Sequence, residues 1–306
     1  MTQETEVHSL KRRLQWALAL NAIIIGAESL IGFRVRSVGL LSDAGHNLID
    51  QGALFLTLYA HLLSLRPASA SRTFGYHRAG IVAAFLNAFL LLLTAAGLSA
   101  MACWRLLNPV PVAGGWMAGA AFISFFANLG IAKLLERDSH HDLNIRSAFW
   151  HMLGDAWVSF GVVASGGLIL LTRWYFLDPL VSLVIVFVVV KGAWTIFKES
   201  MNILMESAPD ELPVGEIAAE LRGLPGVTNV HDFHAWQIKP GLSMVSVHVA
   251  TDDGAGLARE QLLHDVLRLL LRRFKVRHAT VQIENDCCHS EKIYCDFSAS
   301  HKEEPQ

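Results

Sequence analysis

The sequence predicts an α-helical membrane protein with six transmembrane helices, followed by a small α+β domain. Hydrophobic residues make up 53% of the 306 positions and charged residues only 17%, with a mean hydropathy of +0.39. An average soluble domain has about 25% charged residues. Apolar stretches fill the first 200 residues, whereas charges become frequent after residue 206. A single soluble globule is therefore excluded.

Six apolar stretches each approach the ~20 residues that a helix needs to cross a bilayer. They are Trp16–Phe33, Gly39–Leu63, Ala79–Trp104, Gly115–Leu135, Ser147–Thr172 and Trp174–Phe197. We expect residues 1–15 to precede the first span and residues 16–205 to form the transmembrane domain. The charged stretch 2–15 lacks a small-residue cleavage site, so no cleavable signal peptide is expected.

Basic residues near the ends of the spans predict the orientation, since they concentrate on the cytoplasmic side. One side carries Lys11, Arg12, Arg13, Arg66, Arg72, Arg78, Lys133, Arg137, Arg146 and Lys198. The other side carries only Arg34, Arg36, Arg105 and Arg173. Both termini are therefore expected in the cytosol. The net charge of −2 gives no basic surface for nucleic acid.

Residues 206–286 are predicted to form a cytosolic αββαβ domain, and residues 287–306 a flexible tail. Pro213 is suited to the first turn of a helix. The expected elements are a short helix after Pro213, strands 227–238 and 244–251, an amphipathic helix 256–274 and a last strand 278–284. Lys239-Pro240-Gly241 is typical of a hairpin turn between the two strands.

Two identical His-Asp pairs lie inside apolar spans. His46 and Asp50 are four residues apart in the second span, and so are His151 and Asp155 in the fifth. Residues i and i+4 share one face of a helix, so the two faces together offer two imidazoles and two carboxylates. One such pair alone could be a structural hydrogen-bonding group. Two pairs indicate a tetrahedral site for Zn²⁺ or another first-row divalent ion.

Three further polar residues near this site remain open to interpretation. Asp43, near the mouth of the second span, could orient a helix end or a ligand. Asn47 and Glu28 could support the ligands or line a pathway, or they could simply pack and form hydrogen bonds.

Several motifs resemble the cation diffusion facilitator family, most closely its bacterial zinc exporters. The resemblance rests on segments 37–50, 144–155, 202–209, 230–236 and 278–284. It implies a homodimer with a metallochaperone-like cytosolic domain, placed in the inner (plasma) membrane of a bacterium. It also implies Zn²⁺ efflux driven by inward proton movement. His46 in place of an aspartate implies a preference for zinc over cadmium; Cd²⁺ and other divalent ions remain possible substrates.

The same resemblance implies further sites in and beside the soluble domain. Its regulatory zinc ligands correspond to His231, His248, His278 and Glu284. A polar sheet face with surface histidines is the alternative. The tail residues that resemble zinc ligands are Cys287, Cys288, His289 and Cys295, which could instead be unpaired thiols. An ion pair between Arg78 and Glu206 is implied as an interlock between the two domains. Metal capture by His77, His140 or His141 is left open.

Two other functional classes compete with transport. A catalytic zinc usually keeps an open position beside three protein ligands, whereas four candidate ligands close the shell and no HExxH motif occurs. An enzyme is therefore not expected. A metal-sensing receptor with an inert membrane half would leave the buried ionisable pairs without a purpose.

Overall fold

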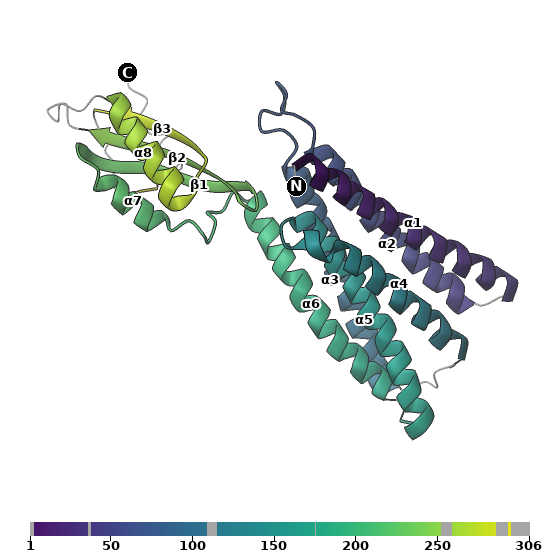
Figure 1. Cartoon of the computed structure of the whole chain (residues 1–306). Coiled ribbons are helices and arrows are strands. Elements are labelled where there is room, and N and C mark those ends of the chain that lie inside the picture. The colour runs from purple at the N-terminus through teal and green to yellow at the C-terminus, as the bar shows by residue number, and fades with distance from the viewer. Residues whose placement is uncertain are drawn as a thin grey trace, which may run out of the picture. The chain divides into compact units, whose positions relative to one another are not determined.

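A computed structural model of the chain describes residues 3–35, 38–108, 115–174, 176–251, 259–285 and 293–294 (Figure 1). The chain divides into two compact units, residues 1–201 and 202–306. The helical unit contains the predicted spans, and the second unit contains the predicted soluble domain.

Six long helices form the first unit. They are α1 (Gln3–Val35), α2 (Val38–Ser64), α3 (Arg78–Leu107), α4 (Gly115–Ser139), α5 (Leu143–Thr172) and α6 (Leu177–Leu204), the last of which extends into the second unit. The shortest has 25 residues, which is enough to cross a bilayer. In the part of the chain that is described, α1, α3, α5 and α6 also reach the mean hydropathy of a membrane span. Polar residues such as Asp50 and His61 lower the hydropathy of α2.

The helices pack through small and branched apolar side chains. Helix α1 lies along α2, α4 lies along α5, and α3 contacts both α2 and α5. The centre of this packing includes Leu14, Leu54, Leu135 and Met152, all of which are fully buried. An ion pair of 2.6 Å joins Arg13 of α1 to Asp138 of α4.

Helix α5 begins where Asp142 caps it and then packs closely against α6. The Asp142 carboxylate accepts hydrogen bonds from the backbone N–H groups of Asn144 and Ile145, which satisfies two free donors of the first turn. Further along, the backbone of Gly192 in α6 faces the Trp150 ring. A Cβ atom at Gly192 would lie 2.6 Å from Cε3 of Trp150. A glycine therefore permits this close approach.

The second unit is the predicted αββαβ domain. Its elements are α7 (Val214–Arg222), β1 (Val227–Lys239), β2 (Leu242–Thr251), α8 (Arg259–Phe274) and β3 (His278–Glu284). The sheet order is β1-β2-β3, with β1 antiparallel and β3 parallel to β2. A parallel pair needs a crossover connection, and α8 lies in that connection. Figure 1 shows α7 and α8 on the same face of the sheet. The core of the unit includes Ile217, Leu221, Val247 and Val266.

The α5–α6 contact leads to a first prediction. Gly192→Ala should destabilise the helical unit by about 1–3 kcal/mol, because the Trp150 ring must shift to admit a methyl group. The measurement is the temperature at which detergent-solubilised protein loses half of its monodisperse peak. Gly97→Ala on α3 is the matched control, since no described atom outside the local helix backbone lies within 4 Å of a Cβ there. Equal midpoints for the two variants would contradict the close packing.

Candidate metal centres

Three of the four predicted membrane ligands converge in the helical unit. Asp50 comes from α2, and His151 and Asp155 lie one turn apart on α5. Nε2 of His151 is 2.9 Å from Oδ1 of Asp50 and 3.7 Å from Oδ2 of Asp155. One donor atom of each residue lies within 4.8 Å of the others. Asp50 is 1% exposed and His151 7%, so the group is shielded by the protein.

The fourth predicted ligand, His46, lies on α2 one turn before Asp50. Its side chain is outside the described part of the structure, so its membership of the site stays a prediction. Because i and i+4 share a helix face, its backbone position is compatible with the site.

Helix register brings this site together. Asp50 lies on the face of α2 that contacts α5. His151 and Asp155 lie on the facing side of α5. Two carboxylates this close repel each other unless a proton or a cation lies between them. One imidazole and two carboxylates are suitable donors for a borderline divalent ion. The group can therefore bind either protons or a metal ion at one place.

A buried carboxylate on α1 supports the segment of α2 that carries the ligands. Oε2 of Glu28 accepts a 2.7 Å hydrogen bond from Nδ2 of Asn47, and Oε1 accepts one of 3.3 Å from Ser124 on α4. Asn21 of α1 also donates to the backbone oxygen of Asn47. The sequence left Glu28 and Asn47 ambiguous; the structure places both in a network that connects α1, α2 and α4. An acid within an apolar span was the available signal.

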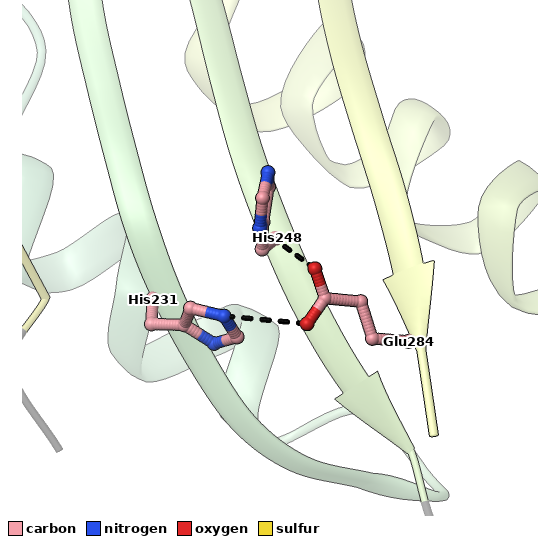
Figure 2. Close-up of side chains that lie close together, drawn as sticks. All are labelled: His231, His248 and Glu284. Carbon is pink, nitrogen blue, oxygen red and sulfur yellow. Dashed lines mark ion pairs between the residues drawn. The ribbon is translucent and has the colours of Figure 1, made fainter. Parts of the chain in front are cut away.

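A second cluster lies on the sheet of the soluble unit, one residue from each strand. Figure 2 shows the rings of His231 and His248 and the carboxylate of Glu284 pointing toward one another. Nδ1 of His248 is 2.8 Å from Oε1 of Glu284, and Nε2 of His231 is 3.4 Å from Oε2. The three donors lie within 4.8 Å of one another. Imidazole nitrogen and carboxylate oxygen are both suitable ligands for zinc. The side chain of His231 is only 1% exposed.

Strand pairing explains why these residues share a face. His231 lies directly opposite His248 in the antiparallel pair, and Glu284 lies opposite Ala250 in the parallel pair. Residues two apart on a strand share a face, so Ala250 and His248 place Glu284 on the same side. The valines of β2 alternate to the other face and pack under the helices.

Within one chain, the structure does not bring His278 together with the other predicted ligands. It lies at the opposite end of β3 from Glu284 and is paired with Met244 rather than with His248. Six strand residues correspond to about 20 Å, which is too far for a shared ion within one chain. Alternation along β3 showed that the two residues share a face, but not that they are close.

Asp232 was not predicted as a site residue, yet it extends this cluster toward His234. A β-bulge occurs between His231 and His234, and Asp232 has a φ of 46°. Oδ2 of Asp232 is 3.4 Å from Nε2 of His248, and Oδ1 is 2.9 Å from Nε2 of His234. Asp232 therefore orients the imidazole of His248 from the side opposite Glu284.

Both units match known families of protein domains. Residues 14–205 match the cation efflux transmembrane domain, and residues 209–286 match the cytoplasmic domain of cation efflux proteins. This chain belongs to the cation efflux family. It is a transporter rather than an enzyme, and its long apolar helices are membrane-spanning elements.

Similar cation efflux proteins match along most of their length. "Zinc transporter ZitB" of Pectobacterium atrosepticum is 35% identical over 290 residues, covering 94% of this chain and 88% of that protein. "Metal cation efflux system protein CzcD" of Cupriavidus metallidurans is 32% identical, covering 95% and 92%. A Bacillus subtilis protein named "Cadmium, cobalt and zinc/H(+)-K(+) antiporter" is 33% identical, covering 88% and 87%. These matches confirm the resemblance to the bacterial zinc exporters of the cation diffusion facilitator family.

The other predicted sites of this cation efflux protein stay predictions. Arg78 begins α3 in the first unit and Glu206 follows α6 in the second, and their proposed ion pair depends on how the units are placed. The tail residues Cys287, Cys288, His289 and Cys295 lie outside the described residues. His140 and His141 are exposed, and neither they nor His77 belong to a metal-ligating group among the described side chains.

The soluble cluster yields a second prediction. In an Asp155→Ala background, chosen to weaken the predicted membrane site, His248→Ala should lower the zinc content of the purified full-length transporter. His278→Ala should retain it, because His278 is at the far end of β3. Inductively coupled plasma mass spectrometry after dialysis measures the metal content. Loss of zinc in the His278 variant as well would show that a residue outside the cluster holds the ion.

Proposed function

We propose that this cation efflux transporter exports Zn²⁺ from the cytosol in exchange for protons. The ligands are His46, Asp50, His151 and Asp155. The main support is the buried convergence of Asp50, His151 and Asp155 from two membrane helices. Ionisable groups inside a membrane mark ion pathways. A sensor with an inert membrane half would not need this group.

Zinc is the substrate best suited to the donor set. Two imidazoles and two carboxylates form a closed tetrahedral shell for Zn²⁺. Two relatives named for zinc transport are 34% and 35% identical to this chain. The Bacillus subtilis relative is named for cadmium and cobalt as well, so Cd²⁺ and other divalent ions are secondary substrates to be tested.

Proton exchange follows from competition for the same donor atoms. A histidine must be neutral to bind a metal, so protons lower metal affinity, and imidazoles titrate near neutral pH. Zn²⁺ loads from the cytosol onto deprotonated His46 and His151. Once the site opens to the other side, protons displace the ion and return inward on the ligands. The name of the Bacillus relative includes H⁺, which supports proton exchange.

The proposed placement is the inner membrane, with both termini in the cytosol. It rests on the distribution of basic residues near the span ends and on the match of residues 209–286 to a cytoplasmic domain. We further propose that two chains form a homodimer through this domain. His231, His248 and Glu284 would hold a regulatory zinc ion that links the three strands.

A transport assay provides the third prediction. Proteoliposomes containing the full chain should accumulate Zn²⁺ when their lumen is acidic and the outside is neutral. Accumulation should stop when a protonophore collapses the gradient. Asp155→Ala should reduce the initial rate to background, because one charged ligand is lost. A zinc-sensitive dye trapped in the lumen measures the rate.

Asp155→Asn is the matched variant, since it keeps the side-chain volume and removes the charge. Both variants must elute as folded protein before the rates are compared. Zinc uptake equal to that of the unaltered chain in either variant would mean that the membrane cluster is structural. Uptake that ignores the pH gradient would refute proton exchange while leaving metal transport intact.

A further inference from the structure

A row of polar side chains continues from the membrane site toward the end of α2. Thr57 and His61 follow Asp50 by seven and eleven residues. At 100° per residue these offsets return to within about 20° of the same helix face. On α5, Asn144 and Ser147 precede His151 by seven and four residues. The two helices therefore carry matching polar rows.

Hydrogen bonds join these rows to α3. Nδ2 of Asn87 donates to Oγ1 of Thr57 at 3.0 Å and to Oγ of Ser147 at 3.4 Å. Nδ2 of Asn144 donates to the backbone oxygen of Thr57 at 2.9 Å. All four residues are at most 2% exposed. These four residues thus form a buried polar cluster that connects α2, α3 and α5 beside the membrane ligands.

His61 lies at the far end of this row. The hydrogen bonds that join the helices do not account for the burial of its imidazole. It is 7% exposed, and among the described residues its buried Nε2 atom has no hydrogen-bond partner. A buried polar atom without a partner is costly. The acidic groups that act on the ring are Asp142, which caps α5, and Asp138, which is paired with Arg13.

We propose that His61 is an intake ligand, which holds the transported cation on the cytosolic side before the cation reaches Asp50 and His151. This inference rests on the proposed direction of transport, in which α2 ends and α5 begins at the cytosol. Eleven helical residues span about 16 Å, so His61 cannot share an ion with Asp50. It forms a separate, weaker site, with one imidazole and the negative field of Asp142.

The polar row explains how a cation would pass between the two sites. A divalent ion cannot cross an apolar layer without oxygen or nitrogen ligands. The hydroxyl and amide oxygens of Thr57, Ser147 and Asn87 can replace water molecules around it one at a time. Passage through a series of sites requires that the first site be weak enough to release the ion. A single neutral imidazole meets that requirement.

The test measures initial Zn²⁺ uptake into inside-out membrane vesicles that contain the full chain, over a range of zinc concentrations. His61→Leu should raise KM roughly three- to tenfold and leave kcat within about twofold, as expected when binding before the slow step is weakened. His264→Leu is the matched control, because that histidine is exposed on α8; its KM should not change.

His61→Cys tests whether position 61 contacts the ion at all. A thiolate is a softer ligand than imidazole and favours Cd²⁺, so the ratio of Cd²⁺ to Zn²⁺ uptake should rise severalfold relative to His61→Leu. A structural histidine would not produce this change in metal preference. If His61→Leu lowers the amount of protein in the membrane, His61→Gln provides the same comparison of KM.

Two results would overturn the inference. One is an unchanged KM in both His61→Leu and His61→Gln. The other is a Cys variant whose cadmium preference equals that of the Leu variant. Failure of the proposed function looks different: Asp155→Ala vesicles would then transport zinc as fast as the unaltered protein. The His61 variants can be compared whatever the outcome for Asp155.

Discussion

The free-energy cost of keeping charged groups inside a bilayer constrains the arrangement of the membrane helices. A charged side chain at the centre of a membrane helix costs about 2.5–3.5 kcal/mol on insertion scales, and two adjacent carboxylates also repel each other. Asp50 and Asp155 therefore need a positively charged occupant, and both lie close to His151. A proton or a metal ion each relieves the repulsion. Alternation between these two occupants is the physical basis of the proposed exchange.

The rest of the helical unit keeps those groups in place. Asn47 is tied to Glu28 and, through its backbone oxygen, to Asn21, so the ligand-bearing turn of α2 cannot rotate without breaking buried hydrogen bonds. Such bonds are expensive to leave unmade in an apolar medium. A metal site whose ligands are oriented by neighbours binds more tightly than one with free ligands. The buried network thus favours one geometry of the site.

Helical periodicity made much of this predictable. The spacing of His151 and Asp155 guarantees a shared face, and alternation along the strands gives the faces of the sheet. Periodicity does not specify the position of one element along another. For this reason the sequence does not show that His278 and Glu284 lie at opposite ends of β3, or that a bulge brings Asp232 to His248. The contact of Asn87 with Thr57 depends on how far α3 is shifted against α2, and no local pattern encodes that shift.

The polar row also bears on how the transporter opens. Helix α3 meets α6 through apolar residues such as Leu91, Val189 and Ala193, whereas it meets α2 and α5 through the hydrogen bonds of Asn87. Separating these helices at that end would break those bonds, each with a net value of about 0.5–1.5 kcal/mol. Water and the hydration shell of a cation can replace them. On the proposed path, the same amide and hydroxyl groups that join the helices would therefore solvate the ion as it enters, and a hydrated cation would make separation of the helices easier.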